Sequence, residues 1–239
     1  FGMLKSDLGS TVDGLFIEAC GNGDVSLMET IIIEGESRES LDQVDSRIVK
    51  RVDFNRRING DTPLMTAARN GHINVIKLLM KQPELDLNVI GGQHKTTALM
   101  IAFSKQNSEL CSKMLALDQE KKIDVNIPGK NGETVLIRAC ILNEVRIVYQ
   151  LMEYESIDVK AKNLNGETAF DIAFFKGFKD LVAILKKASR SEITDLMIAS
   201  RFGEAAQVKH LLQSSKTIVN VEMKGGKTAL MLACYFGHR

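Results

Sequence analysis

Tryptophan is absent from this 239-residue chain, and aromatic residues make up only 5% of it. An interior built from such a sequence has to use Leu, Ile, Val, Ala and Met. This composition suits small, closely packed helices better than a β-sandwich, since sandwiches draw on aromatic and β-branched residues. Net charge is also nearly absent, at +1. We therefore do not expect the whole surface to attract nucleic acid or an anionic membrane.

Cysteine pairs at metal-binding or disulfide spacing are missing as well. The four cysteines are widely scattered, with no Cys-x-x-Cys pair and no histidine at ligand spacing: Cys20, Cys111, Cys140 and Cys234. This scatter argues against a disulfide scaffold and against a zinc site. We predict buried reduced thiols, no metal site and no cofactor.

Long apolar runs and catalytic motifs are the remaining absences. Apolar runs such as residues 97–103, which start with a polar threonine, are far shorter than a membrane span, and no secretory signal is recognisable. These features predict a cytoplasmic protein with no membrane-spanning helix. The chain has no Gly-x-Ser-x-Gly, no phosphate-binding glycine-rich motif and no His-Glu-x-x-His. We therefore predict that it is not an enzyme.

The sequence does contain an internal repeat. The segment from Asp61 to His72, which reads Asp-Thr-Pro-Leu-Met-Thr-Ala-Ala-Arg-Asn-Gly-His, recurs in shorter form along the chain, and residues 15–24 are a weaker copy without the threonine. The aligned threonines lie 35, 37, 34, 26 and 34 residues apart: Thr62, Thr97, Thr134, Thr168, Thr194 and Thr228. A regular period of this length predicts a stack of small repeated units.

Each unit has the same local pattern. The threonine can cap a short helix, as Thr62 does ahead of Pro63, and a glycine such as Gly71 can end it in a left-handed turn. A second helix with an apolar stripe follows. An extended Asp-Val-Asn piece and a glycine turn such as Asn131-Gly132 then predict a β-hairpin.

This pattern closely resembles the ankyrin repeat family over roughly residues 12–239. The resemblance implies an all-α repeat solenoid with short β-hairpin fingers, and it implies binding of another protein rather than chemistry. One departure is consistent, because the histidine after Thr-Pro-Leu is replaced in every copy: Met65, Met100, Ile137, Asp171, Met197 and Met231. The hydrogen bonds of that histidine are lost, so we expect stability to depend more on packing.

We expect one ankyrin repeat domain over residues 3–239. Its approximate units are 12–55, 56–90, 91–128, 129–161, 162–189, 190–222 and 223–239. The last unit shows a first helix, residues 228–236, but no second helix. Because a repeat array needs a polar cap at each end, we expect either that the native chain continues or that a partner covers this face.

Two irregularities interrupt the array. Residues 34–51 form a charged insertion, which is interpreted either as a solvated loop or helical extension, or as a contact element. Its basic cluster lacks interleaved aromatics, so nucleic acid remains an unlikely partner. The 26-residue interval before Thr194 contains no Asp-Val-Asn and no glycine turn. A finger is therefore expected to be missing there, either without consequence or with a changed curvature of the stack.

The candidate binding site lies at the two positions before each glycine turn, which face the concave groove in this family. These positions are polar in the first three units and become largely apolar or aromatic afterwards: Ile141, Leu142, Phe175, Lys176, Arg201, Phe202, Tyr235 and Phe236. Consecutive apolar side chains of this kind mark an interaction surface. For Ile141, packing against the neighbouring unit is an equal alternative. Possible secondary contacts are Arg56, Arg57, His94 and Lys130.

These observations predict a non-catalytic module or scaffold that recognises a partner protein or extended peptide through the groove and fingers. The alternative is a targeting domain of a longer enzyme, or of a secreted bacterial effector acting in the host cytosol, with a catalytic region beyond Arg239. A third hypothesis is that the hairpin asparagines are hydroxylation substrates: Asn55, Asn88, Asn126 and Asn220. The sequence assigns no oligomeric state.

Overall fold

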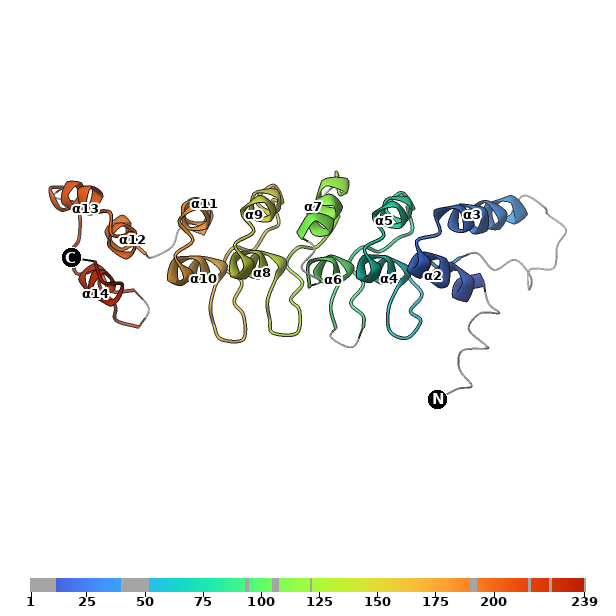
Figure 1. Ribbon diagram of the computed structural model, residues 1–239, viewed down its shortest axis with the longest axis horizontal. Helices are drawn as coiled ribbons and strands as arrows, with labels where there is room; N and C mark the ends of the chain where they lie inside the picture. The colour runs from blue at the N-terminus through green and yellow to red at the C-terminus, as the bar shows by residue number, and fades with distance from the viewer. Residues whose placement is uncertain are drawn as a thin grey trace. The chain divides into compact units, whose positions relative to one another are not determined.

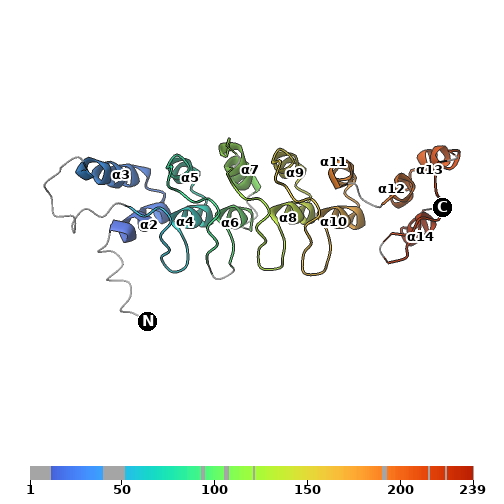
Figure 2. The same cartoon turned by 180° about the vertical axis from the view of Figure 1, so that it is seen from behind.

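The computed structural model describes residues 12–39, 52–92, 95–104, 108–120, 122–189, 193–214, 216–223 and 225–238. Short helices joined by tight turns make up most of these ranges (Figures 1 and 2). The chain divides into two compact units. Unit 1 comprises Phe1–Val135 and Gln150–Ile157, and unit 2 comprises Leu136–Tyr149 and Asp158–Arg239. The prediction of a single domain over residues 3–239 stays a prediction.

Unit 1 contains three helix pairs. They are α2 (Val12–Asn22) with α3 (Val25–Glu39), α4 (Pro63–Asn70) with α5 (Ile73–Leu79), and α6 (Ala98–Ser104) with α7 (Ser108–Leu117). The first helices α2, α4 and α6 pack in a row, and the second helices α3, α5 and α7 form a second row (Figure 1). This is the two-layer arrangement that the repeat predicts.

Unit 2 continues the alternation of first and second helices. Helices α8 (Val135–Leu142) and α9 (Val145–Leu151) belong mostly to it, and the others are α10 (Ala169–Lys176), α11 (Lys179–Ser189), α12 (Asp195–Phe202), α13 (Ala205–Leu212) and α14 (Ala229–Tyr235). Helix α10 packs on α11, and α12 packs on both α13 and α14. The described chain therefore confirms the predicted all-helical repeat architecture.

The ends of the first helices confirm the predicted capping pattern. The hydroxyl of Thr62 accepts a hydrogen bond from the amide of Met65 at 3.2 Å, and Thr168 forms a full capping box with Asp171. Gly71 and Gly177 end their helices in the left-handed conformation, with φ of 80° and 82°. Because a side chain is strained at such a φ, glycine is the residue that fits these turns.

The residues in place of the repeat's histidine are buried in most copies, whereas Met231 is 55% exposed. Met65, Met100 and Met197 are buried at that position, at 3% exposure or less. A different histidine, the one in the Gly-His turn, makes hydrogen bonds between neighbouring repeats instead. Within unit 1, His72 Nε2 lies 2.9 Å from the carbonyl oxygen of Gly21, and within unit 2, His238 Nε2 lies 3.0 Å from that of Arg201.

The fingers of the described chain are tight turns closed by isolated β-bridges, such as Ile58 with Asp61 and Met223 with Lys227. A row of asparagines connects consecutive turns of unit 1. The amide of Asn88 donates to the carbonyl of Lys122 at 2.9 Å and accepts from the backbone of Asp124 at 2.7 Å. Because both amide atoms are engaged, Asn88 has a structural role that is independent of any modification.

The structure bears on both irregularities of the array. Helix α3 continues to Glu39, so the first part of the insertion is a helical extension, whereas residues 40–51 lie outside the described residues. Helix α11 ends at Ser189 and Thr194 caps α12, which leaves only residues 190–193 between them. That connection is too short for a finger, because a finger contains two arms and a turn.

The prediction that all four cysteines are buried is wrong for Cys234. Cys20, Cys111 and Cys140 are buried, but Cys234 is exposed on α14. Burial raises the pKa of the Cys20 and Cys140 thiols to about 12. Among the described residues, α14 has no following helix packed on it, and this leaves the Cys234 side chain uncovered.

Candidate functional site

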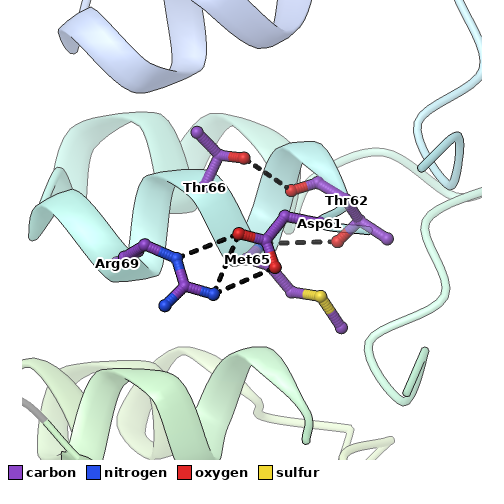
Figure 3. A network of polar contacts seen from close by, with 5 residues as sticks. All are labelled: Asp61, Thr62, Met65, Thr66 and Arg69. Atoms are coloured by element: carbon purple, nitrogen blue, oxygen red, sulfur yellow. Dashed lines mark hydrogen bonds and ion pairs between the residues drawn. The ribbon is translucent and has the colours of Figure 1, made fainter. Parts of the chain in front are cut away.

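The residue before each capping threonine and the seventh residue after it form a recurring pair at the base of the groove. In unit 1 this pair is Asp61 and Arg69, whose side chains point toward one another (Figure 3). Arg69 Nε donates to Asp61 Oδ2 at 2.9 Å and Nη2 donates to Oδ1 at 3.0 Å. This two-bond geometry is the strong form of an arginine–carboxylate pair. The groove is therefore locally neutral at this place.

In unit 2 the same pair of positions has a different chemistry. The pair around Thr228 is Lys227 and Tyr235. Lys227 Nζ lies 5.2 Å from the ring centroid of Tyr235 and also 5.2 Å from the ring centroid of Phe175 on α10. An ammonium group at this distance is attracted to the faces of both rings. We refer to these three residues as the Phe175–Lys227–Tyr235 cluster.

Both rings of the cluster are exposed. Phe175 is 38% exposed, and its other contact is an edge-on one with the buried Phe174, at 5.4 Å between centroids. Tyr235 is 73% exposed and packs edge-on against Phe236 at 4.8 Å. Each ring therefore has one aromatic neighbour and remains exposed, as expected of an aromatic anchor on an interaction surface.

The Arg201 side chain is part of the structure that supports this surface. Its Nε donates to the carbonyl of Phe174 at 3.1 Å and its Nη2 to that of Phe175 at 3.0 Å. The guanidinium also lies 3.5 Å from the ring centroid of Phe236. Partial burial lowers the pKa of Arg201 from its ordinary value. The carbonyls at the C-terminus of α10 carry partial negative charge. By binding them, Arg201 links α10 to α12 and α14.

The other residues of the predicted site differ in accessibility. Leu142 is 47% exposed and Lys176 is exposed, whereas Ile141, Phe202 and Phe236 are half-buried. Half-burial of Ile141 agrees with its alternative role in packing. Nothing in the structure tests whether these side chains bind a partner, so that role stays a prediction.

The predicted secondary contacts are not brought together. Arg56 is paired with the buried carboxylate of Asp13 at 2.8 Å, an interaction within unit 1. Arg57 and Lys130 are exposed. His94 lies outside the described residues.

Two residues of this region are not among those predicted from the sequence. Lys227 was not identified, although the equivalent position carries Asp61, Glu133 and Glu167 in other copies, and this change of charge was a usable signal. Leu164, at the turn of residues 163–166, is 79% exposed. An apolar residue at the end of a finger is a second signal of a contact surface. It is separate from the signal at the groove positions.

A second apolar feature of unit 2 is a groove between α12, α13 and α14. It is lined mainly by aliphatic side chains, among them Leu196, Val208, Leu212, Val219 and Leu230. Leu230 is 74% exposed and Leu212 is 50% exposed.

Within the described ranges, no group of three or more His, Cys, Asp or Glu side chains is arranged to hold a metal ion. No helix in those ranges has the length and hydropathy needed to cross a membrane.

Comparison with known proteins agrees with the architecture. The chain is 27% identical over 231 residues to the human transient receptor potential cation channel subfamily A member 1, which covers 88% of the chain and 19% of the channel. It is 25% identical over 169 residues to the IkB-like protein of African swine fever virus, covering 69% of the chain and 65% of that protein. It is 35% identical over 89 residues to the mouse ankyrin repeat and SAM domain-containing protein 6, covering 36% of the chain and 10% of that protein.

The chain thus spans between a tenth and two thirds of these relatives. The family model for ankyrin repeats, which describes three copies, matches residues 16–128 and 113–195. Together these matches extend over more than half of the sequence. The chain belongs to the ankyrin repeat family.

Proposed function

We propose that this chain is a protein-binding module whose contact surface is the groove side of unit 2, centred on the Phe175–Lys227–Tyr235 cluster. Ankyrin repeats generally mediate protein–protein interaction. The observation that supports this location is the exposure of two aromatic rings, Phe175 at 38% and Tyr235 at 73%, on either side of one ammonium group. Exposed aromatics of this kind are common anchors of interfaces.

The surroundings of the cluster suit an interface. Leu142 and Lys176, which occupy two other groove positions of unit 2, are exposed. Leu164 is exposed at a finger turn. Apolar anchors with polar residues at their margin are typical of non-obligate interfaces. We infer that Lys176 belongs to the polar margin of the contact surface and that Leu142 and Leu164 extend its apolar part.

The test is a capture experiment with the double variant Phe175→Ser, Tyr235→Ser. Truncating two anchors costs about 2 kcal/mol each, so the variant is expected to lose the partners that the wild-type chain retains. The matched control is Tyr149→Ser, because Tyr149 is 59% exposed on the second-layer helix α9 and lies outside the groove positions. Helical circular dichroism should be unchanged in both variants. Equal capture by the double variant and by wild type would overturn this location.

A second candidate is that these repeats are the recognition part of a longer protein. The alignments favour it, since the chain covers only 19% of the human channel and 10% of the mouse protein. In that case the chain alone is expected to retain partner binding, while any catalytic or effector activity resides elsewhere. A comparison of the partners captured by the chain alone with those captured by a longer natural form tests this. A partner bound only by the longer form would count against it.

A further inference from the structure

The charge at the base of the groove changes sign along the array. The residue before the capping threonine is acidic at Asp61, Glu133 and Glu167 and basic at Lys227. Asp61 neutralises Arg69 through two hydrogen bonds. At Lys227 the corresponding partner is an aromatic ring, which attracts the ammonium without cancelling its charge. The cluster is therefore a positively charged site flanked by two apolar rings.

Two carboxylates of unit 2 are engaged with other lysines. Glu204 pairs with Lys179, and Asp195 pairs with Lys186. Among the described residues, Lys227 makes no ion pair, and its ammonium group contacts the two rings. Lys176, the residue after Phe175, is exposed and adds a second positive charge to this end of α10. Charge complementarity at this place favours an anionic ligand group.

The two rings limit the shape of that ligand. Their centroids lie at most about 10 Å apart, since each is 5.2 Å from Lys227 Nζ. Successive residues of an extended peptide advance by about 3.3 Å. Residues two positions apart point the same way, so a segment that places a carboxylate at Lys227 brings the side chains two positions before and after it near Phe175 and Tyr235. Apolar side chains there would cover the exposed rings.

We propose that the Phe175–Lys227–Tyr235 cluster binds an acidic side chain of an extended partner segment, with apolar side chains two positions before and after it packing on the two rings. This inference rests on the proposed function and adds the chemistry of the partner. Arg201 supports this surface, because its Nε and Nη2 donate hydrogen bonds to the α10 carbonyls.

The test is selection from a phage-displayed library of random dodecapeptides on three forms of the chain. Peptides retained by wild type are expected to be enriched in Asp or Glu with Leu, Ile or Phe two positions away. Lys227→Glu should lose this enrichment and favour Lys or Arg. Lys130→Glu is the matched control, since it reverses the charge of an exposed lysine in unit 1, and it should select the same acidic motif as wild type.

A selected peptide then gives the quantitative readout. Its dissociation constant, measured by fluorescence anisotropy, should increase about tenfold or more in Lys227→Gln, which keeps a polar side chain and removes the charge. The affinity of wild type should fall with added salt. Circular dichroism establishes that each variant is folded.

The possible failures are distinguishable. Peptides that depend on Phe175 and Tyr235 but show no acidic preference would overturn the proposed ligand and leave the proposed function standing. Peptides that bind equally well to Phe175→Ser, Tyr235→Ser would overturn both. An acidic motif that persists in Lys227→Glu would also overturn the assignment to Lys227.

Discussion

The guanidinium of Arg201 lies 3.5 Å from the ring centroid of Phe236 while it donates hydrogen bonds to two carbonyls at the end of α10. Helices α11 and α12 are separated by too few residues for a finger, and α14 packs on α12. The Arg201 side chain thus links three first-layer helices at the place where the finger between neighbouring repeats is missing.

Replacing Arg201 by Lys is therefore expected to destabilise the chain. Lysine keeps the charge but cannot donate to two carbonyls and stack on a ring at the same time. The loss of hydrogen bonds by a charged group predicts a decrease in the free energy of unfolding of about 2 kcal/mol. Urea unfolding followed by circular dichroism measures it. The control is Arg146→Lys, an exposed position on α9, and equal stability of both variants would contradict this role.

Much of this architecture could be predicted from the sequence, because it depends on local rules. Thr168 caps its helix and Gly177 ends it, as the spacing of these residues predicts. The missing finger could be predicted from the short interval before Thr194 in the same way. Such features need only neighbouring residues to be known.

The site was less predictable, because its contacts join distant residues. Arg201 occupies a groove position in the sequence, yet it turns onto the carbonyls of α10 and becomes half-buried. Lys227 belongs to a finger and reaches Phe175, 52 positions away in the chain. Neither arrangement follows from periodicity, which gives the face of a helix and not the direction of a long side chain.

The glycine at the end of α12 provides a second test. A Cβ on Gly203 would lie 2.6 Å from Nδ1 of His238, and the φ of Gly203 is +67°. Gly203→Ala is expected to suffer both backbone strain and displacement of His238. Gly166→Ala is the matched control, since Gly166 has a φ of +76° with nothing within 4 Å of the added atom.

The strain alone costs about 1–2 kcal/mol. Thermal unfolding should therefore show a smaller loss for Gly166→Ala than for Gly203→Ala. If the two losses are equal, the contact between Gly203 and His238 contributes nothing to stability.

Thiol accessibility tests the correction at Cys234. Alkylation with iodoacetamide under native conditions should modify Cys234 first, because it is exposed, whereas Cys20, Cys111 and Cys140 are buried. Peptide mass spectrometry identifies the modified positions. In urea all four should react. Early modification of Cys140 in the native protein would show that α8 is less well covered than the structure indicates.

Alkaline pH should destabilise the chain through the buried thiols. Cys20 and Cys140 have a pKa of about 12 in the folded chain, against an ordinary value of 9.0. Their contribution is fully present below pH 9 and is lost as the pH rises, since the unfolded chain releases these protons first. Each thiol contributes a slope of about 1.4 kcal/mol per pH unit.

Urea unfolding between pH 8 and 10 measures this slope. The double variant Cys20→Ala, Cys140→Ala should show a weaker dependence on pH than wild type. The same dependence in both proteins would exclude the two thiols as its source.

The central claim is that partners bind on the aromatic face of unit 2, and site-specific photocrosslinking tests it most directly. A benzoylphenylalanine placed at Tyr235 should crosslink a captured partner or a selected peptide, because this side chain is 73% exposed beside Lys227. The same group placed at Tyr149, 59% exposed on α9, should give little product. Crosslinking at Tyr149 with none at Tyr235 would contradict the account.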